Sequence, residues 1–247
     1  MSKLHWCLGN NFGDKLAPIL YKLLSGTDAQ FVDENHCVKY VTIGSILNRA
    51  SAGDTVWGSG LATQTDLVDK NITITAVRGP LTKEICDRHG VHCPEVYGDP
   101  ALLYPKFYKP VISTKYELGI IPHYVDKGNA ILGKLKYIPG IRIIDVTIGI
   151  NRFIDELCSC EKIAASSLHG IIAADAYGIP SIWLKFSDKI VGSGFKFMDY
   201  FLSVKRPYQE PLVMNEYITL DDILKAFYHY EIDVDLNRLF DACPFRK

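Results

Sequence analysis

The sequence carries almost no net charge and no long apolar run. Lysine and arginine number 27 against 28 aspartate and glutamate residues over 247 positions, so the net charge is −1. A chain without excess positive charge has no general attraction for nucleic acid, so a charged ligand must be bound by local groups. No window is long enough for a transmembrane helix, and the apolar run in the opening MSKLHWCLGNNFGD is too short for a signal peptide. We therefore expect a cytoplasmic protein.

The sequence also lacks a cysteine framework and a nucleotide-binding loop. Its seven cysteines are scattered through predicted strands and helices, a pattern typical of reduced thiols. Cys158 and Cys160 are too close together, and too isolated from other Cys and His clusters, to predict a zinc site. The turn GNNFGD does not have the G-x-x-x-x-G-K-[ST] spacing that binds phosphates, so it predicts no nucleotide site.

The most informative stretch is CEKIAASSLHGIIAADAYGIPSIWL, at residues 160–184. Its pattern predicts a buried strand, a turn of small polar residues, a helix over 168–177 and a second apolar strand. Ser166, Ser167 and His169 therefore follow the carboxyl end of a strand and lie at the amino end of a helix. Backbone N–H groups at such a turn bind anions in parallel α/β proteins. The stretch predicts a ligand site.

His169 has two interpretations at this point. A histidine on an otherwise apolar helix is more often a hydrogen-bonded packing residue than a catalyst. Its place at the strand-to-helix turn instead favours acid–base chemistry, because an imidazole gains and loses a proton near neutral pH. His123, in the sequence IPHYVDK, also follows a predicted strand and is a second candidate.

The opening strand leads into a candidate ligand loop. In GNNFGD, Gly13 lets the backbone approach a ligand closely, and Asn10 and Asn11 offer hydrogen bonds. We predict that Asp14 is the N-cap of the following helix, although the same carboxylate could accept a proton from a substrate hydroxyl.

Two further loops of the first half follow predicted strands. Ser59 and Gly60 end the sequence VWGSG, and Arg78 follows the strand predicted over 72–77. An arginine at the carboxyl end of a strand can bind a carboxylate or a phosphate through two parallel hydrogen bonds. The alternative is a surface ion pair.

The loop after residue 184 supplies three more cations, Lys185, Lys189 and Lys196. Most lysines on such a loop are only solvated. They are nevertheless the leading additional cations for an anionic ligand.

Strands and helices alternate in both halves of the chain, which predicts parallel sheets with right-handed crossovers. The pattern restarts after the Pro-, Tyr- and Lys-rich stretch near residue 112. We predict an α/β fold with two Rossmann-like domains, at 1–112 and 113–205, that face each other across a cleft, followed by a helical extension at 206–247.

At this level of detail the chain resembles the polysaccharide pyruvyl transferase family. The resemblance is carried, in this order and spacing, by GNNFGD, VWGSG, RGPLT, YGDPALLYP, IPHYVDK and SSLHGIIAADAYGIPSIW. It implies a two-domain fold of the kind called GT-B, with residues 1–112 as the expected acceptor side and residues 113–205 as the expected donor side. It also implies transfer of the enolpyruvyl unit of phosphoenolpyruvate onto two hydroxyls of a sugar, which forms a pyruvate ketal and releases phosphate. Such chemistry requires no metal and no cofactor.

The resemblance implies roles for the candidate residues. His169 becomes the general acid, and Asp14 and His123 become the groups that activate the acceptor hydroxyls. The family often has arginine two residues before this histidine, where the chain has Ser167, so one of the loop lysines is expected to replace that charge. The expected substrate-binding residues are Arg78, Asn10, Asn11, Gly13, Ser59, Gly60, Ser166, Ser167, Leu168, Lys185, Lys189 and Lys196.

Partners and alternatives follow from the same resemblance. We expect phosphoenolpyruvate as donor and a saccharide acceptor of a cell-surface polysaccharide pathway, usually lipid-linked, which would bring the protein to the inner membrane face. The alternatives are a glycosyltransferase of similar fold that uses a nucleotide sugar, and an inactive sugar-binding relative. The acceptor sugar, the ketal positions and the oligomeric state stay open.

Overall fold

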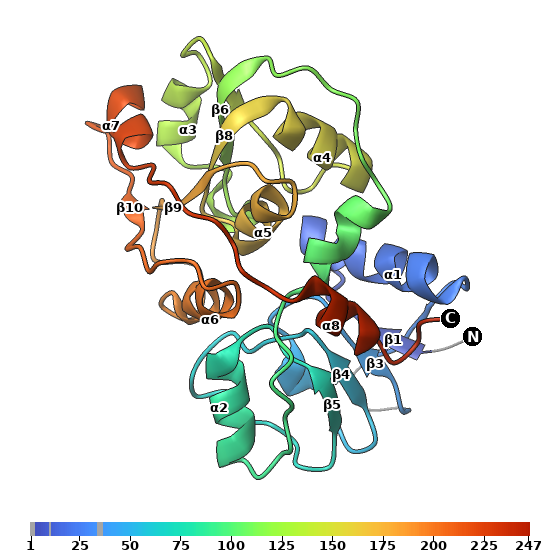
Figure 1. Cartoon of the computed structure of the whole chain (residues 1–247). Helices are drawn as coiled ribbons and strands as arrows, with labels where there is room; N and C mark the ends of the chain where they lie inside the picture. The colour runs from blue at the N-terminus through green and yellow to red at the C-terminus, as the bar shows by residue number, and fades with distance from the viewer. Residues whose placement is uncertain (1–2, 10, 34–36) are drawn as a thin grey trace.

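Two parallel sheets form the framework of the protein. A computed structural model describes residues 3–9, 11–33 and 37–247, and within them the strands form two five-stranded sheets (Figure 1). Every strand pairing in both sheets is parallel. The predicted α/β fold with two Rossmann-like halves is therefore confirmed.

The strands of each sheet come from one half of the chain. The first sheet has the order β2-β1-β3-β4-β5 and consists of β1 (Lys3–His5), β2 (Gln30–Phe31), β3 (Tyr40–Val41), β4 (Thr55–Trp57) and β5 (Thr73–Ala76). The second has the order β10-β9-β8-β6-β7 and consists of β6 (Tyr116–Ile121), β7 (Ile141–Ile143), β8 (Cys160–Ala165), β9 (Ser181–Lys185) and β10 (Leu212–Val213).

Each strand order contains one point where the crossover connections turn to opposite sides. In the first sheet this point lies between β1 and β3, because the chain runs from β1 to β2 on one side and from β3 to β4 on the other. In the second sheet it lies between β6 and β8 for the same reason. Loops diverge at such a switch point and leave a crevice at the carboxyl ends of the strands, where open α/β sheets bind ligands.

Helices cover the sheets and join the halves. They are α1 (Phe12–Ser25), α2 (Pro80–Arg88), α3 (Ala130–Leu135), α4 (Ile150–Cys158), α5 (Leu168–Ala176), α6 (Phe195–Ser203), α7 (Leu220–Lys225) and α8 (Leu236–Asp241), with short 3₁₀ turns η1 (Leu47–Arg49), η2 (Pro100–Lys106) and η3 (Tyr124–Asp126). Helix α1 of the first half packs against α4 of the second, where the Phe12 and Phe153 rings lie 4.5 Å apart. One apolar core thus continues from half to half.

The start of α1 differs from the prediction. We expected Asp14 to be the N-cap, but the cap is Asn11, whose side chain accepts a hydrogen bond of 3.1 Å from the Asp14 backbone N–H. Asparagine is as good an N-cap as aspartate, so the helix begins one turn earlier. The Asp14 carboxylate is thereby left out of capping.

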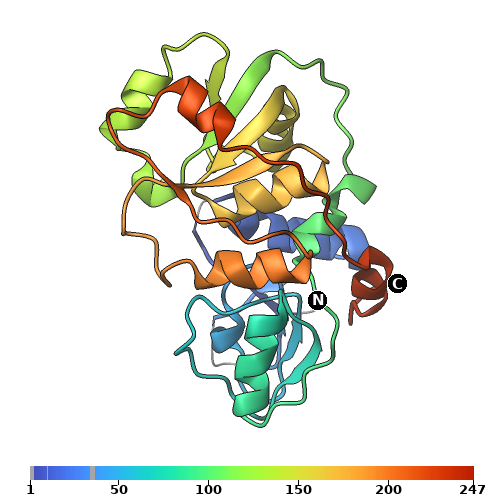
Figure 2. The same cartoon turned by 60° about the vertical axis from the view of Figure 1, so that its left-hand side comes forward.

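Two later segments return to the first half. Helix α6 lies between the two sheets in both views (Figures 1 and 2) and packs against α2. Helix α8 lies on the first half, where the Trp57 indole N–H donates to the Leu239 carbonyl at 2.9 Å. The predicted terminal helices are present, and the segment that links them to the second half also contributes the unpredicted strand β10. A two-residue edge strand is too short to leave a clear alternating pattern in the sequence.

Candidate functional site

A cavity of about 200 Å³ lies between the two sheets, where both switch points meet. The loops after β1, β3, β6 and β8, together with α6, supply its lining residues: Cys7, Asn11, Asp14, Gly44, Ser45, Ile46, His123, Tyr124, Ser167, Leu168, His169 and Lys196. Four strand ends from distant parts of the sequence thus converge on one cavity. We call this cavity the cleft.

His169 is packed between the cleft and a buried carboxylate. Its Nε2 is buried, has no hydrogen-bond partner in the described part of the chain, and lies 3.6 Å from Asp99 Oδ2. The other oxygen of Asp99 caps η2 by accepting from the Ala101 N–H at 2.9 Å. This leaves Nδ1 as the ring nitrogen available to a ligand.

Gly13 is required for this arrangement. A Cβ atom at Gly13 would lie 2.3 Å from Cε1 of the His169 ring, so only glycine allows α1 and α5 to approach this closely. The glycine predicted to allow close approach to a ligand instead allows the approach of the candidate catalytic side chain.

Asp14 faces His169 from the first half. Burial raises the pKa of the Asp14 carboxyl group from 3.8 to about 6, while nearby His169 and the hydrogen bonds from Asn11 act in the opposite direction. The Asn11 Nδ2 donates to Asp14 Oδ2 at 2.5 Å. A carboxyl group with a pKa near 6 can exchange a proton close to neutral pH.

His123 is held as a neutral ring. Burial lowers the pKa of His123 from 6.5 to about 4, and neighbouring Lys196 and His169 add to the effect. Its Nδ1 accepts a hydrogen bond of 3.4 Å from the Val125 N–H, so the proton of the neutral ring lies on Nε2. His123 can therefore donate a hydrogen bond without carrying a charge.

Of the three loop lysines, only Lys196 lines the cleft. It has no hydrogen bond or ion pair within the described residues, and burial, with the charge of Arg78, lowers the pKa of its ammonium group from 10.5 to about 8. Lys185 forms an ion pair of 2.6 Å with Asp188 outside the cleft, and Lys189 is exposed. The cleft thus contains an unpaired cation that is still mostly charged at neutral pH.

Arg78 lies behind the cleft and does not line it. Its guanidinium group is buried and pairs with Asp199 of α6 at 2.9 Å. It also donates to Ser45 Oγ and to the Leu61 carbonyl, both at 2.6 Å. The guanidinium group that we expected to bind an anion joins the two halves through Asp199 and holds Ser45 at the cleft wall.

Three other expected binding residues also have structural partners. Ser59 is fully buried and donates to the Gly44 carbonyl at 2.9 Å. A Cβ at Gly60 would lie 2.4 Å from Arg78 Cζ, so Gly60 makes room for the guanidinium group. Ser166 is fully buried and accepts a hydrogen bond of 2.8 Å from the His123 N–H. Asn10 lies outside the described residues.

Replacing Arg78 with lysine is expected to destabilise the protein. Lysine keeps the charge but cannot donate to Asp199, Ser45 and Leu61 at once, and unsatisfied buried acceptors cost about 1–3 kcal/mol each. Urea denaturation should show a lower midpoint for Arg78→Lys, with Arg152→Lys on an exposed face of α4 as the control. Equal midpoints for wild type and Arg78→Lys would contradict this structural role.

Comparisons with known proteins show the family of the chain. The chain belongs to the polysaccharide pyruvyl transferase family, whose sequence model matches residues 24–188. The match includes His123 and His169 but excludes Asp14 and Lys196, so the placement of these last two rests on the structure.

Two curated relatives have been found. The chain is 31% identical over 176 residues to an uncharacterized protein L143 of Acanthamoeba polyphaga mimivirus, covering 67% of this chain and 60% of that protein. It is 30% identical over 201 residues to the succinoglycan biosynthesis protein ExoV of Rhizobium meliloti (strain 1021), covering 77% of this chain and 60% of that protein. The matches thus span about 60% of the length of each relative.

No helix in the described ranges has the length and apolar character needed to cross a bilayer. Within the same ranges, no three histidine, cysteine or acidic side chains lie close enough together to hold a metal ion.

Proposed function

We propose that the protein transfers the pyruvyl group of phosphoenolpyruvate onto two hydroxyls of a saccharide in a cell-surface polysaccharide pathway. One observation carries the proposal: the unpaired cation Lys196 shares the cleft with His123 and His169. The same cleft contains Asp14, whose carboxyl group can exchange a proton close to neutral pH. Membership of the family and similarity to a succinoglycan biosynthesis protein support the substrate class.

The reaction makes definite demands on the cleft. Two carbon–oxygen bonds form at C2 of phosphoenolpyruvate, the bond from C2 to the phosphate oxygen breaks, and the methylene carbon gains a proton and becomes a methyl group. The acceptor hydroxyls lose two protons in total. One of them restores the proton that the general acid gave to the methylene carbon, and the other leaves with the phosphate. The balance requires a proton donor, a proton acceptor and a cation, and no cofactor.

The cleft residues suit these roles. His169 delivers the proton from Nδ1, Asp14 takes protons from the acceptor hydroxyls, and the neutral His123 orients a hydroxyl or the donor. Lys196 binds the carboxylate or phosphate of the donor and replaces the arginine absent at Ser167.

Asp99 is the expected positioning residue for His169. Asp99→Asn keeps an oxygen to cap η2 but removes the negative charge 3.6 Å from Nε2. We expect kcat to fall at least roughly tenfold with little change in the KM for phosphoenolpyruvate, because the imidazole loses its orientation. Nitrogen NMR of the His169 ring should show a changed tautomer or protonation state. An unchanged ring spectrum would mean that Asp99 is only a helix cap.

The function itself is tested by ligand stabilisation followed by turnover. Phosphoenolpyruvate should raise the melting temperature more than the nucleotide sugars UDP-glucose and GDP-mannose do. Phosphate should then be released only when a saccharide acceptor is present, and mass spectrometry should find the ketal on the sugar. Stabilisation by a nucleotide sugar alone would identify a glycosyltransferase, and stabilisation by sugars alone would identify an inactive sugar-binding relative.

The membrane association of the protein is a separate part of the proposal. A lipid-linked acceptor would hold the protein at the inner face of the membrane while turnover lasts. Flotation with vesicles that carry the lipid-linked saccharide, compared with plain vesicles, tests this directly.

A further inference from the structure

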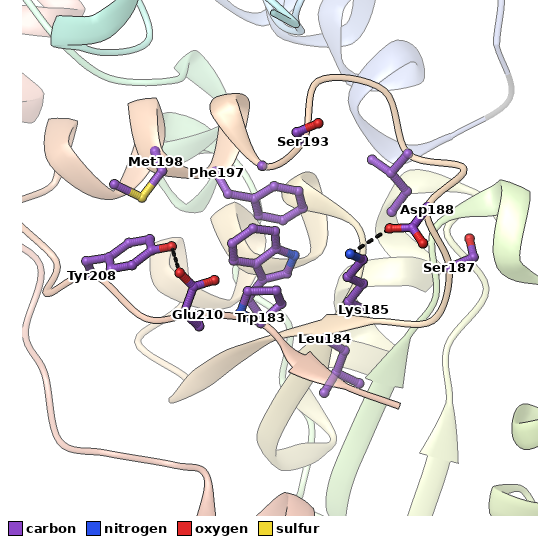
Figure 3. A pocket seen from close by; sticks show the side chains of 13 residues that line it. Trp183, Leu184, Lys185, Ser187, Asp188, Ser193, Phe197, Met198, Tyr208 and Glu210 are labelled. Atoms are coloured by element: carbon purple, nitrogen blue, oxygen red, sulfur yellow. Dashed lines mark hydrogen bonds and ion pairs between the residues drawn. The ribbon is translucent and has the colours of Figure 1, made fainter. Parts of the chain in front are cut away.

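A second cavity lies beside the cleft, on the other side of the first turn of α6. Its volume is about 260 Å³, and it is lined by residues from β9, from the loop before α6 and from the segment before β10 (Figure 3). Lys196 faces the cleft, and the next residue, Phe197, faces this second cavity. Consecutive Cα atoms are about 3.8 Å apart, so the two cavities are neighbours. We call it the side pocket.

The side pocket has an apolar wall with one unused hydrogen-bond donor. The Trp183 and Phe197 rings stack at 4.3 Å with an interplanar angle of 14°. Trp183 is only 8% exposed, and its indole Nε1–H has no hydrogen-bond partner among the residues that the structure describes. This nitrogen is not one of the fully buried unpartnered atoms, so it is open to the pocket and can donate to a ligand hydroxyl in place of water.

Each charged side chain of the side pocket already has a partner within the protein. Lys185 pairs with Asp188 at 2.6 Å on one side of the rings, and the Tyr208 hydroxyl donates to Glu210 at 2.5 Å on the other (Figure 3). With one cation and two carboxylates, the lining repels phosphates and other anions. It still offers carboxylate oxygens as acceptors for hydroxyl groups.

We infer that the side pocket binds an uncharged sugar unit of the acceptor, next to the unit that reacts in the cleft. A sugar ring has an apolar face for the aromatic wall and hydroxyls for the carboxylates and the indole N–H. The volume lies just below the ~300–1,000 Å³ of drug-sized ligand sites, which suits a single ring. This inference rests on the proposed function, because it assigns the pocket to the acceptor of that reaction.

A chain of hydrogen bonds through the buried Asp126 links the side pocket to the cleft. Ser187 of the pocket lining donates to Asp126 Oδ1 at 2.5 Å, and Ser166 donates to the other oxygen of Asp126 at 3.4 Å. Ser166 in turn accepts from the His123 N–H at the cleft. The Asp126 carboxylate therefore joins the loops of both cavities and fixes the distance between them. A saccharide can then place one sugar unit in each cavity.

The test follows the indole N–H signal of Trp183 by NMR, assigned with Trp183→Phe. The probes are the methyl glycosides of glucose, galactose and mannose in the millimolar range, with uridine diphosphate and phosphoenolpyruvate as anionic probes. We expect at least one glycoside, and neither anion, to shift the signal. Glu210→Ala should raise the dissociation constant of that glycoside roughly tenfold, whereas Glu216→Ala, at another exposed glutamate, should not change it.

The outcomes separate this inference from the proposed function. The sugar subsite is wrong if no glycoside shifts the Trp183 signal, if Glu210→Ala and Glu216→Ala behave alike, or if uridine diphosphate alone shifts it. If the glycosides bind as expected while phosphoenolpyruvate stabilises neither wild type nor variant, the sugar subsite stands and the proposed donor is wrong. The spectrum of each variant shows whether it is folded.

Discussion

Lys196→Met is expected to weaken phosphoenolpyruvate binding by roughly ten- to a hundredfold, the value of one charge-assisted contact. The side chain is the unpaired cation of the cleft, and methionine keeps its unbranched apolar stem while it removes the charge. Calorimetric titration of both proteins with phosphoenolpyruvate measures the change. Lys189→Met, which removes an exposed charge from the same loop, is the matched control and should bind like wild type.

The pH dependence gives this prediction a second readout. Because the pKa of Lys196 is lowered to about 8, wild-type affinity should fall as the pH rises above about 8, where the free protein loses this charge. The variant should lack this fall. Equal affinities of wild type and Lys196→Met, or equal pH profiles, would show that Lys196 does not bind the donor.

The same substitution should stabilise the fold. A lysine whose folded-state pKa is lowered costs stability at all pH values below about 8, and the cost disappears between pH 8 and its ordinary pKa of 10.5. Lys196→Met should therefore denature at a higher urea concentration than wild type at pH 7, with the difference vanishing towards pH 10.5. A residue that lowers stability while it binds substrate is common at functional sites.

His169→Asn is expected to reduce turnover by about a hundred- to ten-thousandfold, the usual contribution of general acid–base catalysis. Asparagine is polar and smaller than histidine, so it fits against Gly13 without a clash. It cannot gain or lose a proton. Phosphate release under saturating donor and acceptor measures the loss, and the melting temperature should change little because the side chain is at the cleft wall.

A matched variant separates chemistry from binding. His123→Asn removes the other cleft histidine, which the structure holds neutral with a pKa near 4, so it should affect substrate binding more than the chemical step. A rate within a few-fold of wild type for His169→Asn, or an unfolded variant, would favour the interpretation of His169 as a packing residue.

Local sequence signals were sufficient for the architecture. Alternating strands and helices imply parallel sheets, because each helix brings the chain back to the end of the sheet where the preceding strand began. Glycine at a helix end is an equally local signal: Gly178 follows α5 and has a φ of 69°, a conformation that side-chain-bearing residues rarely adopt. The positions of His169 and His123 after β8 and β6 could also be predicted, since they depend only on where each strand ends.

The choice among similar residues depended on tertiary structure. Nothing local distinguishes Lys196 from Lys185, but α6 turns one into the cleft while the other meets Asp188. Arg78 was expected at a ligand, yet Asp199, which is 121 residues away in sequence, binds its guanidinium group. Asp99 was not among the candidate site residues, because only the tertiary structure brings its carboxylate to 3.6 Å from His169 Nε2.

The sequence by itself thus determined the two parallel sheets, the polar strand ends and the family. Whether a given polar side chain meets a ligand or another side chain was decided only by the tertiary structure. The physical reason is that a charge in a buried place must find a partner, and that partner comes from whichever element packs against it, at any distance along the chain. The hydrophobic pattern of strands and helices predicts which residues are buried, but it does not predict which group a buried polar side chain will contact.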